Sequence, residues 1–187
     1  MQASRTLAVA VALFAGAPLA VHARSNSSTD PTDQAFMQKA AAGGLMEVQL
    51  GQLAQQKAQS DAVKAFGQRM IEDHTKANDQ LQSIAQQENV ALSTDLKGEQ
   101  KQMVDRLSKL QGAEFDRQYM SAMVRDHTED VQAFERQAKR PSESPVKQFA
   151  ASTLPTLKEH LQLAKQTQAQ VGGAGGTTRH KPATHQM

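Results

Sequence analysis

The stretch Val63-Lys-Ala-Phe66-Gly-Gln-Arg-Met70-Ile-Glu-Asp-His74-Thr-Lys-Ala-Asn-Asp-Gln-Leu81 decides the fold. Its apolar side chains recur every three or four residues, which is the spacing of one face of an α-helix. The same spacing places His74 in the middle of that face. The stretch therefore predicts a long helix, over about 61–88, that carries an ionisable group toward a core.

Other parts of the chain have the same periodicity. They predict long helices over about 33–58, 112–138 and 143–170 and a short one over about 95–110. Helix-forming Ala, Gln, Lys, Glu and Leu dominate, and the runs of Val, Ile, Thr and aromatic residues typical of strands are absent. We therefore predict an all-α fold, with Thr32 as the N-cap of the first helix and a bend in the last helix at Pro155.

The connections predict how these helices are arranged. Two or three residues join the first two long helices, and a short turn, Lys139-Arg-Pro-Ser142, joins the last two, so each pair should form an antiparallel hairpin. The segment 89–111 between the hairpins could span roughly 40 Å, about the length of the bundle. We predict a ferritin-like four-helix bundle, whose two antiparallel hairpins are joined by a long crossover that carries the short helix. An up-down-up-down bundle with an elaborated loop is the alternative.

The two ends of the chain differ from the helical region. An apolar run follows Arg5, and Val21-His-Ala23 supplies the small residues of a cleavage site, so 1–23 is predicted to be a signal peptide cleaved after Ala23. The polar residues 24–32 and the Gly-rich tail 171–187 are predicted to be disordered around a bundle at 33–170. No other segment has the about 20 apolar residues of a membrane helix. The mature protein is thus predicted to be periplasmic and without a membrane span; an uncleaved N-terminal anchor is the alternative.

Composition also excludes classes of function. The 21 Lys and Arg residues nearly balance 19 Asp and Glu residues, so we expect no nucleic-acid partner. The absence of Cys excludes disulfides, thiolate zinc sites, iron–sulfur clusters and cysteine catalysis. Nothing in the sequence identifies a protein partner.

Each predicted long helix carries one ionisable residue in its apolar face. Glu47 continues the first helix's series at positions 36, 40, 43, 50 and 54, and His74, His127 and His160 have equivalent places in the other three. Counting residues from the two hairpin turns places all four near mid-bundle. The expected offset along the axis is about 3 Å between Glu47 and His74 and about 6 Å between His127 and His160.

These four residues are predicted to be metal ligands. Burying a carboxylate away from water costs several kcal/mol unless a cation or hydrogen bonds compensate its charge. Burying even a neutral polar group without a hydrogen bond costs about 1–3 kcal/mol. Three imidazoles and one carboxylate suit Fe, Zn, Cu or Mn. The residues three before the histidines are Ile71, Val124 and Leu157, so the Glu-x-x-His pattern of di-iron bundles is absent and a mononuclear site is predicted. A metal-free polar cluster is the alternative.

Four neighbouring residues are predicted to support the site. Asp73 and Asp126 each precede a histidine, and residues one apart point about 100° away from each other on a helix, so both should lie behind the ligands or face solvent. Tyr119 lies on the same face as His127, where it could hydrogen-bond across the core or act as a redox-active phenol. Asp116 is its candidate hydrogen-bond partner.

On these residues the chain resembles a bacterial family of ferritin-like exported proteins called domain of unknown function 4142, also labelled predicted outer membrane proteins. The resemblance covers about 33–168, and it implies a ferritin-like bundle without implying an activity. The segments that carry it are Ala41-Ala-Gly-Gly-Leu-Met-Glu47, Phe66-Gly-Gln-Arg-Met-Ile-Glu-Asp-His74, Gly112-Ala-Glu-Phe-Asp-Arg-Gln-Tyr119, Asp126-His127 and Leu154-Pro-Thr-Leu-Lys-Glu-His160.

Three functions are compatible with these features. We predict a periplasmic bundle that binds a divalent transition metal, in metal handling or oxidative-stress defence. A mononuclear metal oxidase or peroxide-consuming enzyme is the first alternative, with Glu47 as ligand or base and Tyr119 as redox partner. A metal-free structural or partner-binding bundle is the second.

Overall fold

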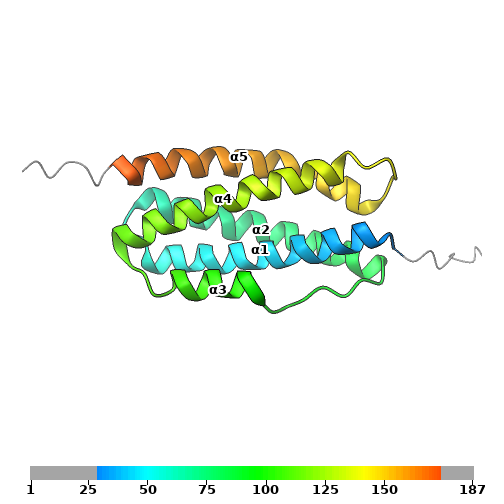
Figure 1. The fold of residues 1–187 in the computed structure, drawn as a ribbon, viewed down its shortest axis with the longest axis horizontal. Helices are drawn as coiled ribbons and strands as arrows, with labels where there is room; N and C mark the ends of the chain where they lie inside the picture. The colour runs from blue at the N-terminus through cyan, green and yellow to red at the C-terminus, as the bar shows by residue number, and fades with distance from the viewer. Residues whose placement is uncertain (1–28, 174–187) are drawn as a thin grey trace, which may run out of the picture.

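The computed structural model describes residues 29–173, and in this range the chain forms five α-helices and no strand (Figure 1). They are α1 (Pro31–Lys57), α2 (Asp61–Gln87), α3 (Gly98–Leu107), α4 (Gly112–Ala138) and α5 (Pro145–Gly173). The four long helices pack as two hairpins, α1 with α2 and α4 with α5. None of the described helices is both long enough and apolar enough to cross a membrane. The predicted signal peptide and residues 174–187 of the predicted tail lie outside the described residues.

The crossover between the hairpins runs the length of the bundle. From the end of α2 the chain returns along the outside of α1, where α3 packs, and it reaches the start of α4 beside the α1–α2 turn (Figure 1). Therefore α2 and α4 run in the same direction, which confirms the ferritin-like topology and contradicts the up-down-up-down alternative. The short helix is shorter than predicted, and Gly112, with φ of 59°, begins α4 in a conformation that favours glycine.

The described part of the N-terminal segment is ordered, contrary to prediction. The first helix begins at Pro31, and its N-cap is Asp30, not Thr32, because Asp30 Oδ1 accepts a 2.7 Å hydrogen bond from the Thr32 amide. Arg140, two residues after the end of α4, also donates to Asp30, at 2.8 Å. The Thr29 hydroxyl donates to the Glu88 carbonyl at 2.8 Å. These contacts hold residues 29–32 against the end of the bundle.

The last helix extends beyond its predicted end. It continues through Pro155 and ends at Gly173, three residues past the predicted boundary at 170. Val171, predicted to start the disordered tail, packs against the apolar core. A helix that gains apolar contacts is stabilised beyond what the composition of its last turn suggests.

The apolar core consists of two clusters. One lies toward the α1–α2 turn and includes Leu50, Phe66, Met70, Phe115 and Met123. The other lies toward the α4–α5 turn and includes Met37, Leu81, Phe134, Phe149 and Leu157. In the first half of α1 the buried face is shifted by one residue from the prediction, because the buried positions are 37, 41 and 44 instead of 36, 40 and 43.

Close contact between α1 and α2 depends on glycine. A Cβ atom added at Gly51 would lie 2.6 Å from the Gly67 carbonyl oxygen and 2.8 Å from Cγ1 of Ile71. We expect Gly51→Ala to lower the free energy of unfolding by about 1–3 kcal/mol, because the helices must separate to accommodate the methyl group. A Cβ at Gly43 meets no atom within 4 Å, so Gly43→Ala should raise stability by up to about 1 kcal/mol. Urea unfolding of both variants checks this, and a stabilising Gly51→Ala would contradict it.

Candidate metal centre

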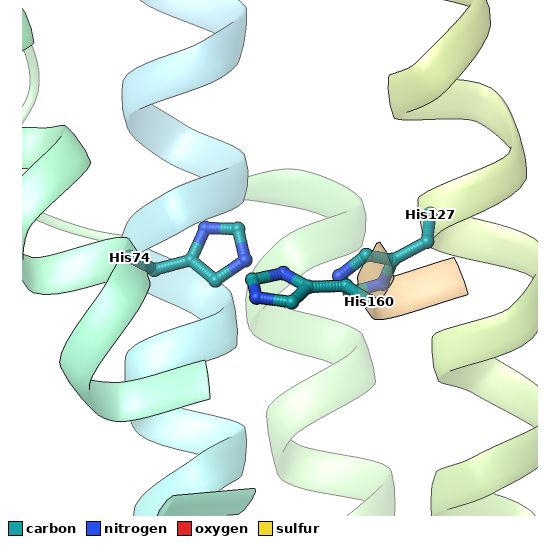
Figure 2. A group of neighbouring side chains, drawn as sticks. All are labelled: His74, His127 and His160. Carbon is teal, nitrogen blue, oxygen red and sulfur yellow. The ribbon is translucent and has the colours of Figure 1, made fainter. Parts of the chain in front are cut away.

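The four residues predicted from the helix faces meet in a polar layer between the two apolar clusters. Glu47 comes from α1, His74 from α2, His127 from α4 and His160 from α5, and all four are buried. Figure 2 shows the three imidazole rings gathered in the space between their helices. Their ring centroids are 5.4–5.8 Å apart. The side chains therefore meet in spite of the offsets along the bundle axis that were expected from counting residues.

The three histidines form one group of neighbouring ligand atoms, and Glu47 forms another with Asp126 and His127. One ring nitrogen from each histidine lies within 4.8 Å of those of the other two. Glu47 Oε2 is 2.6 Å from His74 Nε2, and Glu47 Oε1 is 3.2 Å from His127 Nδ1. A tetrahedral ion with bonds of about 2.0–2.1 Å holds its ligand atoms roughly 3.4 Å apart, so the histidine nitrogens would have to move closer together to share one ion.

Most of these buried atoms have no hydrogen-bond partner. In the described residues, the unpartnered buried atoms include both carboxylate oxygens of Glu47, Nε2 of His74, Nε2 of His127 and Nδ1 of His160. The contact between Glu47 and His74 is short, but it does not have the angles of a hydrogen bond. Buried polar atoms normally find partners, so a group of them facing one another is exceptional.

Hydrogen bonds on the outer side of two rings determine which nitrogen is free. Nδ1 of His127 lies 3.0 Å from the Met123 carbonyl oxygen and donates to it, so Nε2 carries the lone pair. Nε2 of His160 lies 2.7 Å from Asp73 Oδ2 and donates to it, which leaves the lone pair on Nδ1. Carboxylate or carbonyl acceptors behind the ring are the usual companions of metal-bound histidine.

Asp73 therefore lies behind a ligand, although it supports His160 on α5 and not its own neighbour His74. Arg69 donates to the same Asp73 oxygen at 3.2 Å and to Glu159 at 2.8 Å. Burial alone would raise the pKa of Asp73, but the hydrogen bonds from His160 and Arg69 outweigh it and lower that pKa. Asp73 therefore stays ionised and holds the His160 ring in place.

Burial keeps the imidazoles neutral. It lowers the pKa of His127 to about 3 and that of His160 to about 4, and it also lowers the pKa of His74. Their lone pairs are therefore available to an ion at neutral pH. Burial, and after it the charge of Asp130, raises the pKa of Glu47 well above its usual range. Without a cation, the protonated and uncharged form of Glu47 is therefore favoured.

Two acidic residues of α4 continue the polar layer toward the surface. Burial, and then Glu47, raises the pKa of Asp126 to about 8, and burial, and then Asp126, raises that of Asp130 to about 7. Asp126 was among the residues predicted from the sequence, whereas Asp130 was not. The position of Asp130 could have been predicted, because it is three residues after His127 and four after Asp126, and such residues share a helix face.

The predicted pairing of Asp116 with Tyr119 is wrong. Asp116 instead accepts hydrogen bonds from the amides of Gln59 at 3.2 Å and Ser60 at 2.9 Å, so it caps the α1–α2 turn from α4. Tyr119 is buried, its ring stacks on Phe115, and its hydroxyl has no hydrogen-bond partner among the described residues. Burial, and then the charge of Glu47, raises the pKa of this hydroxyl well above its usual range, so it remains protonated.

Comparisons with known proteins agree with this architecture. A family model described as "Domain of unknown function (DUF4142)" matches residues 18–167. No curated protein matches the chain. The crystal structure of a DUF305 fragment from Deinococcus radiodurans is similar, with a TM-score of 0.66 and 15% identity over 75% of this chain and 97% of that one. A DUF305 protein from Streptomyces coelicolor has a TM-score of 0.64 and 12% identity over 75% and 94%. At this identity the likeness concerns the fold alone.

Proposed function

Because this chain belongs to the DUF4142 family, whose function is unknown, we propose a function from the site itself: the bundle binds one divalent transition-metal ion between its four long helices. The proposed ligands are Nε2 of His74, Nε2 of His127, Nδ1 of His160 and the carboxylate of Glu47. In support, such an ion would give these unpartnered atoms a partner and would favour the ionised form of Glu47.

The ligand chemistry narrows the choice of ion. Three neutral imidazoles and one carboxylate favour Zn, Fe, Cu or Mn over Mg or Ca, which prefer all-oxygen sites. The hydrogen bonds from His160 to Asp73 and from His127 to the Met123 carbonyl support a ligand role, because they orient each ring before an ion arrives. We further propose that the protein acts in the periplasm, in metal handling or oxidative-stress defence, after cleavage of the predicted signal peptide.

Zinc titration by calorimetry tests the proposal. We expect the mature, untagged protein to bind one equivalent of Zn²⁺, and His160→Ala to bind at least tenfold more weakly, because the variant loses one ligand. The matched control is the double variant His180→Ala, His185→Ala, which removes histidines of the C-terminal tail and should bind as the wild type does. If His160→Ala binds zinc unchanged, or if the tail variant loses the binding, the proposed site is wrong.

A further inference from the structure

We propose that Glu47 and Asp126 form a second cation site beside the histidines, one that takes a hard divalent ion such as Mn²⁺ or Mg²⁺. Glu47 is the bridge between the two sites, so this inference rests on the proposed function. The second site differs from the first in its ligand atoms, which are carboxylate oxygens and water, and in its position, which is nearer the surface.

The orientation of Glu47 is the first observation. Its side chain is fully buried, and its oxygens make no hydrogen bond except with the Asp126 carboxyl group when one of these two groups is protonated. Oε2 faces His74 Nε2 at 2.6 Å, whereas Oε1 lies 3.2 Å from Nδ1 of His127, the edge of that ring opposite its free nitrogen. One carboxylate oxygen is thus directed toward the histidines, and the other is available to a different ion.

Asp126 supplies the second ligand. Oxygen atoms of Glu47 and Asp126 and a nitrogen of His127 lie within 4.8 Å of one another, and Asp126 Oδ2 is buried without a hydrogen-bond partner. Because Nδ1 of His127 already donates to the Met123 carbonyl, the two carboxylates remain as the protein ligands on this side. Two buried carboxylates this close repel each other unless a cation or a proton lies between them.

A groove between α1, α3 and α4 connects Asp126 with the surface. It has a volume of about 530 Å³, and Asp126, Asp130 and Glu129 of α4 line one side of it. Lys39, Arg106 and Arg125 also line the groove, yet none of them forms an ion pair with Asp126 or Asp130 within the described range of the chain. Asp126 and Asp130 therefore have no salt-bridge partner among these three basic residues, although Lys39 is near enough for its charge to act on Asp130.

The groove also has the room that a hard cation requires. Mg²⁺ keeps several water molecules and is usually bound through one or two carboxylates, and Mn²⁺ likewise suits carboxylate, carbonyl and water ligands. A cavity of this size holds many water molecules, in contrast with the closed layer around the histidines. The nitrogen-rich and oxygen-rich sites should therefore select different ions.

Manganese titration of the zinc-loaded protein tests the inference. The protein is first given one equivalent of Zn²⁺, and Mn²⁺ is then added while the electron paramagnetic resonance signal of free Mn²⁺ is recorded. We expect one further equivalent of Mn²⁺ to bind. Asp126→Asn should weaken manganese binding at least tenfold and leave the zinc stoichiometry at one. Glu129→Gln, an exposed residue on the rim of the same groove, is the matched control and should change neither.

The outcomes separate this inference from the proposed function. If zinc binds at the histidines and manganese does not bind, the second site is wrong and the first stands. If Asp126→Asn binds manganese as the wild type does, or loses zinc, Asp126 does not have the assigned role. His160→Ala should bind zinc at least tenfold more weakly and still bind manganese through Glu47 and Asp126. If the wild type binds neither ion, both proposals fail.

Discussion

Zinc should raise the free energy of unfolding by about 2.7 kcal/mol when its free concentration is a hundredfold above the dissociation constant. For a chain of this size the corresponding rise in melting temperature is roughly 5–10 °C. The reason is linkage: the four ligands come from four helices and are far apart in the unfolded chain, so the ion binds only the folded state. Thermal melting with and without zinc measures the effect.

Alanine at a ligand position should remove most of this gain. His127→Ala is the sharpest variant, because His127 is fully buried and its free nitrogen has no other partner. Thr128→Ala, at the next and half-buried position, changes a hydroxyl that bonds the Val124 carbonyl and should keep the zinc response. The proposed ligand set would be refuted if no metal raised the melting temperature of the wild type. It would also be refuted if zinc raised the melting temperature of His127→Ala as much as that of the wild type.

Replacing Glu47 and His74 together by leucine should stabilise the metal-free protein by about 1–4 kcal/mol and abolish zinc binding. Both side chains are buried, and their facing atoms make no hydrogen bond in the described structure. Leucine removes the cost of burying these polar atoms and extends the neighbouring apolar clusters. Urea unfolding in the presence of a chelator measures the stability, and calorimetry measures the loss of zinc.

The opposite outcome would favour the metal-free alternative. If the double leucine variant is less stable than the wild type under chelation, the Glu47–His74 contact itself holds the bundle together, and the polar layer is a structural cluster. The variant Met70→Leu is the matched control, because it exchanges one fully buried apolar side chain for another on the same helix face. It should change stability by less than about 1.5 kcal/mol and leave zinc binding intact.

Periodicity was sufficient to predict that Glu47, His74, His127 and His160 lie on buried helix faces, because the face on which a helical residue lies is a local property of the chain. His74, His127 and His160 interrupt clear apolar series and are buried in the structure. The first half of α1 was misjudged because its alanines and glycines, Ala40-Ala-Ala-Gly-Gly44, give almost no hydrophobic contrast from one residue to the next. In the structure Met37 lies in the core and Phe36 lies at its edge. The ring centroid of Phe36 is 4.9 Å from that of Phe134.

The side-chain hydrogen bonds between helices could not be predicted from the sequence. Asp116 caps a turn that is 56 residues away along the chain, and Asp73 holds a histidine 87 residues away. Both roles depend on which helices are neighbours and at what height, and helical periodicity does not contain that information. For Asp130 the sequence was sufficient to predict the helix face but not the neighbour. Its closeness to Glu47 follows from the packing of α1 against α4, which the sequence did not predict.

The polar layer between the two apolar clusters is a plane of weak cohesion across the bundle. Above and below it, apolar side chains contact one another across all the long helices, but within it the facing atoms lack hydrogen-bond partners. We therefore expect one end of the bundle to open locally at a lower free-energy cost than the whole bundle. A bound ion would join four helices at this plane, so that partial opening at either end would have to break a metal–ligand bond and the two halves would unfold as one unit.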